Sequence, residues 1–207
     1  MAGPATAEEV GQSLDVSRET LDRLGAYAEL LQKWQRRINL VSASTIADLW
    51  RRHILDCGQI ARYLPPGARD IVDLGSGAGL PGLILAIVTG TAVHLVESDA
   101  RKCAFLHEAA RLTGAPVKIH RVRIEDLAGW PADAVTGRAL APLPRLLDLA
   151  ERFLRPGTIC LFPKGREAGE ELTESTKGWM MRVERFASLS DPSGSILRLS
   201  EVRRSRT

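Results

Sequence analysis

The chain has 207 residues, of which 44% are hydrophobic and 26% are charged, so it can bury one sizeable core. Its longest aliphatic run, residues 83–88, is far too short to cross a bilayer, and residues 1–10 lack the features of a secretory leader, so we expect a cytoplasmic protein. The separated cysteines Cys57, Cys103 and Cys160 form no C-x-x-C pair, which argues against a disulfide framework and a metal site and indicates reduced core residues.

The net charge of +3 is unevenly distributed along the chain. Residues 1–100 carry 9 Lys and Arg against 12 Asp and Glu, whereas residues 101–207 carry 19 against 13. A basic C-terminal half is typical of a surface that faces phosphate, although a solvated basic face explains the charge equally well. The candidates for phosphate contacts include Arg121, Arg123 and Lys164.

The first 66 residues predict a helical region. The sequence Thr6-Ala7-Glu8-Glu9 has the form of a capping box, and apolar residues recur at helical spacing over residues 21–38 and again over residues 46–64. Pro65 and Pro66 end the second of these patterns. We therefore expect a helical cap over residues 1–66 and a main domain over residues 67–207, which together form one compact unit.

The second long helical pattern carries His53 and Asp56. These residues lie three positions apart and so share one face of a helix. An imidazole oriented by the carboxylate and directed at the sheet is one interpretation, and an ordinary structural histidine is the other.

Strand and helix patterns alternate from residue 70 onward. The strand patterns lie at residues 71–74, 93–96, 117–120, 134–136 and 158–162. Between them lie helix patterns, and this alternation predicts an α/β fold with a mostly parallel sheet covered by helices on both faces. Two further strand patterns, around residues 180–189 and 195–199, flank Asp191-Pro192-Ser193-Gly194 and predict an antiparallel hairpin that completes a seven-stranded sheet.

The first strand leads into the pattern D-x-G-x-G-x-G, from Asp73 to Gly79. Glycines allow a tight turn and the close approach of a ligand to the backbone, and the amides at the start of the next helix point toward that ligand. A dinucleotide fingerprint places glycine where this chain has Leu80, so the spacing disfavours NAD. The pattern resembles the first motif of the Rossmann-like methyltransferases that bind S-adenosylmethionine. A glycine-rich turn without a ligand is the remaining alternative.

Two later strand ends provide candidate contacts to an adenosine. Glu97 ends the second strand, where a carboxylate can accept hydrogen bonds from ribose hydroxyls, although an ordinary acid at a strand end is the alternative. Ile124 and Glu125 follow the third strand and would lie beside the base. This spacing favours an adenosine-bearing ligand over a bare phosphate.

Missing residues narrow the choice of reacting atom. Residues 137–142 lack the (N/D)-P-P-(Y/F) signature of amino-group methyltransferases, and no cysteine lies between Cys103 and Cys160 to act as the nucleophile of a pyrimidine-C5 enzyme. Guanine N7 needs neither feature, because its free lone pair attacks a sulfonium methyl without loss of a proton. Catalysis at N7 then depends on positioning and electrostatics.

The accumulated motifs resemble the bacterial 16S ribosomal RNA guanine-N7 methyltransferases, also known as glucose-inhibited division protein B. The resemblance covers about residues 15–165 and depends on Lys33-Trp34, Asn39-Leu40, Arg52 to Asp56, Asp73 to Gly82, Arg101-Lys102, Phe105-Leu106, Arg123 to Glu125, Arg138-Ala139 and Lys164-Gly165. It implies a Rossmann-like class I methyltransferase fold. It also implies a monomeric cytoplasmic enzyme that methylates one guanine of the small-subunit RNA.

The resemblance also assigns site residues. Its cofactor contacts fall on Gly75, Leu80, Glu97, Ile124, Glu125 and Arg138. Arg138 is expected to position the target base without a general base, and a structural ion pair with a neighbouring acid is the alternative. Further candidate contacts to RNA or the active site are Asn39, Arg52, His53, Asp56, Arg121, Arg123 and Lys164. The C-terminal segment departs from the family, which leaves RNA contacts by Arg203, Arg204 and Arg206 open.

The leading hypothesis is therefore an S-adenosylmethionine-dependent methyltransferase that acts on guanine N7 in 16S RNA or a small-subunit particle. Docking through Arg and Lys contacts to phosphate is expected to be sensitive to salt. A small-molecule methyltransferase, a dinucleotide-dependent oxidoreductase and a non-catalytic RNA-binding module remain as alternatives.

Overall fold

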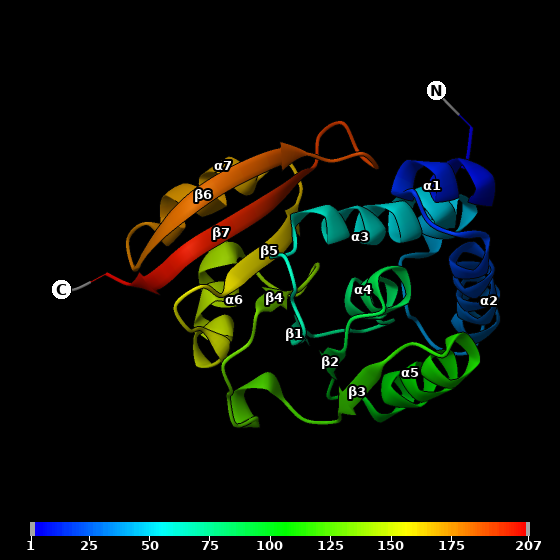
Figure 1. Ribbon diagram of the computed structural model, residues 1–207, viewed down its shortest axis with the longest axis horizontal. Coiled ribbons are helices and arrows are strands. Elements are labelled where there is room, and N and C mark those ends of the chain that lie inside the picture. The colour runs from blue at the N-terminus through cyan, green and yellow to red at the C-terminus, as the bar shows by residue number, and fades with distance from the viewer. Residues whose placement is uncertain (1–2, 206–207) are drawn as a thin grey trace.

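The computed structural model describes residues 3–205 and shows a seven-stranded sheet flanked by helices (Figure 1). The strands are β1 (Ile71–Leu74), β2 (Val93–Val96), β3 (Val117–His120), β4 (Ala134–Thr136), β5 (Ile159–Lys164), β6 (Trp179–Ala187) and β7 (Ser195–Arg204). Their order across the sheet is β3-β2-β1-β4-β5-β7-β6. The first five are parallel, and β7 pairs antiparallel with both β5 and β6. The predicted parallel sheet with a closing hairpin is confirmed.

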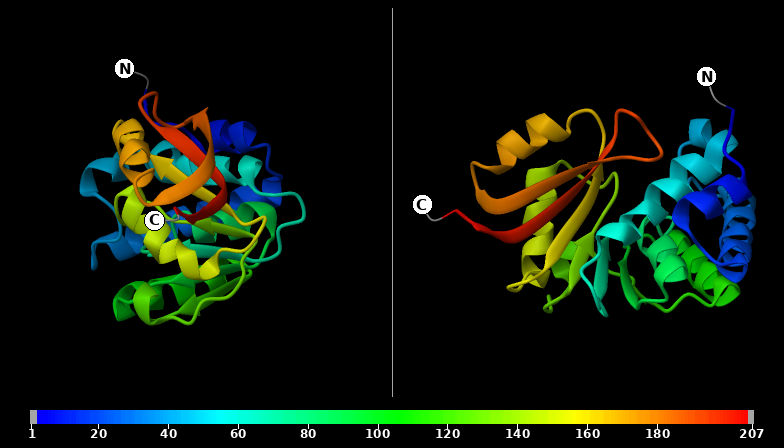
Figure 2. Two further views of the ribbon diagram at one scale, coloured as in Figure 1. Left: turned by 90° about the vertical axis from the view of Figure 1, so that its left-hand side faces the viewer. Right: turned by 45° about the horizontal axis from the view of Figure 1, so that its top comes forward.

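Both faces of the sheet are buried, because successive strand residues point to opposite sides. On β1, Ile71 belongs to one apolar cluster, whereas Val72 and Leu74 belong to another. The first cluster includes residues of α4 (Gly82–Thr89) and α5 (Ala100–Thr113), and the second includes residues of α6 (Leu143–Ala150), η5 (Glu151–Phe153) and η4 (Ile124–Asp126). The helix α7 (Ala168–Ser175) lies beside α6 and the β6–β7 hairpin (Figures 1 and 2). This double coverage explains the nearly continuous apolar sequences of the central strands.

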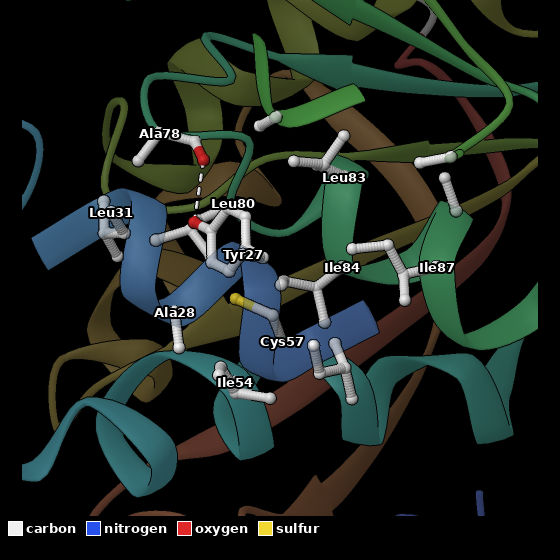
Figure 3. Packing of buried hydrophobic residues seen from close by; sticks show 14 of the residues in the cluster. Tyr27, Ala28, Leu31, Ile54, Cys57, Ala78, Leu80, Leu83, Ile84 and Ile87 are labelled. Atoms are coloured by element: carbon white, nitrogen blue, oxygen red, sulfur yellow. Dashed lines mark hydrogen bonds between the residues drawn. The ribbon is translucent and has the colours of Figure 1, made fainter. Parts of the chain in front are cut away.

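The N-terminal region covers the α4 face of the sheet. It begins with α1 (Ala7–Leu14), which has the predicted capping box at Thr6, and α2 (Arg18–Gln35). Their apolar faces join the same buried cluster as α4, as Figure 3 shows for Tyr27, Leu31 and Ile84. The hydroxyl of Tyr27 donates a hydrogen bond to the carbonyl of Ala78 at 2.8 Å (Figure 3). The helical cap therefore supports the glycine loop (residues 75–81) directly.

Residues 43–63 differ from the regular helix that the periodicity predicts. They form consecutive 3-10, π, α and 3-10 turns, named η1 (Ala43–Asp48), η2 (Trp50–Leu55), α3 (Asp56–Gly58) and η3 (Gln59–Tyr63). In the wider π turn, the amide of Asp56 donates to the carbonyls of both Arg51 and His53. Wide turns of this kind frequently occur at functional sites.

Strand β7 is longer than predicted and continues to Arg204. The Arg204 guanidinium lies 4.1 Å from the ring centroid of Trp179 and pairs with Asp148 and Glu151, at 3.0 and 2.8 Å. These contacts extend the pairing of β7 beyond its apolar part. Arg206 lies outside the described residues.

All three cysteines are buried with free thiols, as predicted. Burial raises the pKa of the Cys57 and Cys160 thiols to about 12, so neither is activated as a nucleophile. Within residues 3–205, no helix has both the length and the apolar character needed to span a membrane.

Candidate active site

A cleft of about 1320 Å³ opens beside the carboxyl ends of β1, β4 and β5. This is the edge of a parallel sheet at which ligands of such folds bind. Its walls come from the glycine loop, the segment after β4, the end of β5 with the start of α7, the cap, and the β6–β7 loop. Representative lining residues of these five walls are Gly77, Arg138, Lys164, His53 and Asp191.

The glycine loop exposes backbone to the cleft. Gly75 and Gly77 have φ angles of +64° and +55°, which side chains with a Cβ rarely adopt. A Cβ at Gly75 would lie 2.7 Å from Leu140 Cδ1, whereas a Cβ at Gly77 would meet only the Gly75 carbonyl, at 3.9 Å. At Gly77 the loop therefore offers open space against bare main chain, which a ligand can occupy, whereas at Gly75 the main chain is bare but Leu140 lies close to it.

Asp73 anchors the start of the helix that follows this loop. Its Oδ2 accepts a hydrogen bond from the Gly82 amide at 3.1 Å. Its Oδ1 is buried and has no hydrogen-bond partner within residues 3–205. Burial raises the pKa of Asp73 to about 7, against the opposing effect of its hydrogen bonds.

Glu97 joins the end of β2 to the glycine loop. Its Oε2 accepts from the Gly77 amide at 2.9 Å, and its Oε1 accepts from the Asp99 amide at 2.8 Å. The side chain is therefore fixed beside the loop, although it does not line the cleft itself. Its proposed role toward ribose stays a prediction.

Ile124 and Glu125 also lie outside the cleft wall. Ile124 is buried in the cluster that contains the ends of β1 and β2. Glu125 pairs with Arg145 at 2.6 Å and with Arg123 at 3.8 Å. Their assignment as cofactor contacts stays a prediction, since the structure places them near the relevant strand ends but not in the cleft.

Arg138 follows β4 and makes the central polar contacts of the cleft. Its Nη1 donates to Asp56 Oδ2 at 3.0 Å and to the Arg52 carbonyl at 3.1 Å. Its Nη2 donates to His53 Nδ1 at 2.9 Å. The structural ion pair considered as the alternative role for Arg138 is thus present. We name Arg138, His53 and Asp56 the Arg138 centre.

His53 is not oriented by Asp56, contrary to one interpretation of their spacing. Both side chains contact Arg138, and His53 Nε2 lies 2.8 Å from Thr45 Oγ1. Because a guanidinium only donates, His53 Nδ1 accepts and Nε2 carries the proton. Burial, together with the charges of Arg138 and Arg52, lowers the pKa of His53 to about 4, so the ring is neutral at pH 7.

The β6–β7 loop forms a wall that the sequence did not identify. Ser190 Oγ donates to Asp56 Oδ1 at 2.5 Å, and Asp191 pairs with Arg52 at 3.0 Å. The Leu189 amide donates to Gln59 Oε1 at 2.7 Å. The only signal in the sequence was the turn at residues 191–194, which predicted a bend but no partner.

The remaining candidates divide between cleft and surface. Asn39, Arg52 and Lys164 line the cleft, whereas Arg121 and Arg123 are exposed and do not. The ammonium of Lys164 lies 2.7 Å from Glu171 Oε2, and Glu171 also lines the cleft. Sequence reasoning missed Glu171, because it belongs to a polar helix with several acids.

Solved structures of low sequence identity share this fold. TYW2 from M. jannaschii, in complex with AdoMet, matches with a TM-score of 0.58 and 17% identity over 82% of this chain and 80% of that chain. Fibrillarin from Aeropyrum pernix, with natively bound S-adenosyl-L-methionine, matches with a TM-score of 0.53 and 15% identity over 66% and 68%. The Rossmann-like methyltransferase fold expected from the sequence is confirmed.

Sequence comparison identifies the family of the chain, whereas the solved structures identify only its fold. Two proteins named ribosomal RNA small subunit methyltransferase G are similar over nearly their whole lengths. The one from Rhodospirillum centenum is 59% identical over 95% of this chain and 91% of that protein, and the one from Rhodospirillum rubrum is 53% identical over 96% and 99%. The sequence model of the GidB family, described as rRNA small subunit methyltransferase G, matches residues 20–195. The chain therefore belongs to the rRNA small subunit methyltransferase G family.

Proposed function

We propose that the protein is an S-adenosylmethionine-dependent methyltransferase that acts on N7 of one guanine in 16S ribosomal RNA. The observation that carries the proposal is the family match over residues 20–195, combined with a cleft that joins the glycine loop to the Arg138 centre. The family favours this function over the oxidoreductase and the non-catalytic alternatives. The choice of guanine N7 depends on the motif resemblance and on the chemistry of the cleft.

The residues present fit S-adenosylmethionine. Bare main chain at Gly75 and Gly77 faces the cleft, and a side chain at Gly75 would collide with Leu140. Glu97, which is fixed beside Gly77, provides the carboxylate for ribose hydroxyls. When bound, the cofactor supplies an electrophilic sulfonium methyl group.

The cleft suits a nucleophile that has no proton to lose. Methyl transfer to the N7 lone pair, with cleavage of the carbon–sulfur bond, would move one positive charge from sulfur to the purine without loss of a proton. The imidazole of His53 already accepts from Arg138 and lies within hydrogen-bond distance of Thr45, so neither of its nitrogens is free to act as a base. No cysteine is among the described residues that line the cleft, which fits a mechanism without a covalent adduct.

The cleft wall is also balanced in charge. Its cations are Arg52, Lys102, Arg138 and Lys164, and its anions are Asp56, Glu167, Glu171 and Asp191. Fixed carboxylates close to a purine stabilise the positive charge that develops on it without reorganisation of solvent. We assign Arg138 to positioning the target base through its rigid contacts with the cap.

We further propose that the protein is a cytoplasmic monomer with two parts, residues 1–66 and 67–207, that fold as one unit. The support for one unit is the apolar cluster shared by α2 and α4. Elution of the purified protein at the volume of a 22.6 kDa species would support the monomer.

The test of the function uses small ribosomal subunits from a bacterium that lacks its own member of this family. We expect methyl transfer from labelled S-adenosylmethionine to these subunits and none to subunits from the parent strain, whose site is already modified. Reduction with borohydride and cleavage with aniline would then map a single 7-methylguanosine. Methylation of a free metabolite, with no transfer to RNA, would instead support the small-molecule alternative.

A further inference from the structure

The cleft contains a second buried ion pair, which the Arg138 centre does not involve. Lys164 ends β5 and Glu171 lies near the start of α7, and their side chains are only 9% and 20% exposed. Lys164 Nζ lies 2.7 Å from Glu171 Oε2, and both residues line the same cleft as the glycine loop. A charged pair so well buried at a substrate cleft requires a specific explanation.

Structural contacts use only part of the hydrogen-bonding capacity of this pair. The ammonium of Lys164 donates to the Ala141 carbonyl at 3.0 Å and forms an ion pair with Glu171 Oε2 at 2.7 Å, contacts that occupy at most two of its three hydrogens. Glu171 Oε2 also accepts from the Leu143 amide at 2.5 Å. Within residues 3–205, no hydrogen bond is formed by Glu171 Oε1. The pair therefore offers one donor beside one acceptor.

A donor beside an acceptor complements the Watson–Crick edges of guanine and adenine in opposite orientations. Guanine presents the acceptor O6 next to the donor N1–H, whereas adenine presents the donor N6–H₂ next to the acceptor N1, so the pair would place N7 of the two purines on opposite sides. RNA-modifying enzymes commonly recognise a target base by the Watson–Crick edge after it leaves the stack. We propose that Lys164 and Glu171 select the target guanine, with Lys164 donating to O6 and Glu171 accepting from N1–H. This inference depends on the proposed function.

The arrangement also suits methyl transfer to N7. The N7 atom is on the five-membered ring, away from N1, so a base held by its N1–H keeps N7 free to face the rest of the cleft. Alkylation of N7 makes N1–H more acidic, so its hydrogen bond to a carboxylate strengthens as the methyl bond forms. Interactions that strengthen in the transition state increase kcat. The contact between Lys164 and Ala141 ties this recognition to the segment that carries Arg138.

The first test compares Glu171→Gln with the control Glu174→Gln. Glu174 lies on the same helix, and its exposed side chain pairs with Lys177 outside the cleft. The glutamine at position 171 retains an oxygen for Lys164 and the Leu143 amide but removes the charge that compensates Lys164, so we expect a lower melting temperature and, at a temperature where the variant is folded, unchanged affinity for S-adenosylhomocysteine. We expect kcat on unmodified small subunits to decrease by about 10- to 100-fold, with a smaller change in KM. The control should match the wild type.

A second test uses the wild-type protein, so it does not depend on the folding of a variant. Reconstituted small subunits would carry inosine or 2-aminopurine at the mapped position. Inosine keeps O6 and N1–H, and 2-aminopurine lacks both while keeping N7. We expect inosine to be methylated at a rate within about tenfold of that for guanine, and 2-aminopurine to be slower than inosine by about 10- to 100-fold.

The outcomes separate this inference from the proposed function. Equal rates for inosine and 2-aminopurine, or a Glu171→Gln variant with the wild-type kcat, would overturn the role of the pair while methylation of guanine still stands. Failure of the wild-type protein to methylate unmodified subunits would overturn the proposed function itself.

Discussion

The glycine loop and the Arg138 centre line the same cleft, but the contacts that hold them span very different distances along the chain. The hydrogen bonds from Gly82 to Asp73 and from Gly77 to Glu97 join residues 9 and 20 positions apart. Arg138 contacts His53 and Asp56 from 85 and 82 positions away, and Asp56 contacts Ser190 across 134 positions. The hydrogen bonds of Asp73 and Glu97 on the proposed cofactor side thus lie within one βαβ unit, whereas the proposed base side forms only when the cap, β4 and the hairpin assemble.

We expect substitutions in these two regions to change different properties of the protein. Changes at the glycines that face the cleft should mainly affect cofactor affinity, because the hydrogen bonds from the loop to Glu97 and from Gly82 to Asp73 are local. Changes in the Arg138 centre should affect turnover and the stability of the cap together. The four substitutions below test that separation, beginning with the largest expected effect.

Gly75→Val should abolish cofactor binding. The substitution forces a β-branched residue into a φ of +64° and places its Cβ 2.7 Å from Leu140, so the cleft beside the loop is filled. Calorimetry with S-adenosylhomocysteine should detect no heat. The matched control is Gly25→Val on α2, where a Cβ meets no atom within 4 Å. Wild-type affinity in the Gly75 variant would contradict the assignment of the loop.

Arg138→Ala should reduce turnover more than cofactor affinity. Its loss removes the donor that His53 and Asp56 share, and a misplaced polar group at a target base costs about 100-fold in kcat. Steady-state kinetics on unmodified small subunits and calorimetry would measure the two effects. Arg18→Ala, which breaks an exposed ion pair on α2, serves as the control. Equal losses of turnover and cofactor affinity would argue against a role at the base.

Glu97→Ala should weaken cofactor binding by roughly 1.5 to 3 kcal/mol, the range for a charge-assisted hydrogen bond. The buried carboxylate also accepts from the Gly77 and Asp99 amides, so the loop loses an anchor as well. Calorimetry would measure Kd, with Glu174→Ala as the control for an exposed acid. An unchanged Kd would favour an ordinary acid at a strand end.

His53→Asn should reduce the change in the free energy of unfolding between pH 7.5 and 4.5 by about 2 to 3 kcal/mol. The pKa of His53 is about 4 in the folded protein and near 6.5 when unfolded, so the unfolded chain binds a proton first as the pH falls. The free energy of unfolding of the wild type therefore loses this contribution between pH 6.5 and 4. Asparagine keeps an acceptor for Arg138 but does not titrate.

Urea unfolding of both proteins at pH 7.5, 5.5 and 4.5 measures this difference. The lowered pKa values of His94 and His120 and the raised pKa of Asp73 also contribute to the pH dependence, but they are present in both proteins and cancel in the comparison. Parallel curves for the two proteins would show that His53 titrates normally in the folded state.

The accuracy of the sequence predictions follows the same division between local and distant contacts. The glycine loop, the capping box at Thr6 and the parallel strands were predicted correctly, because periodicity and φ preferences act over a few residues. The periodicity of residues 43–63 predicted a helix but not its π turn. The spacing of His53 and Asp56 placed them on one face, yet it carried no information about Arg138 as their common partner.

The sequence alone determined the α/β fold, the glycine loop at the end of β1 and the family, since these depend on local patterns and on motifs in fixed order. Only the tertiary structure decided which polar side chains meet in the cleft: Arg138 with Asp56, Ser190 with Asp56, and Lys164 with Glu171. The physical reason is that side chains brought together by packing need no common spacing in the sequence. Their pairing is set by the close approach of β5, α7, the cap and the hairpin loop, which no local pattern encodes.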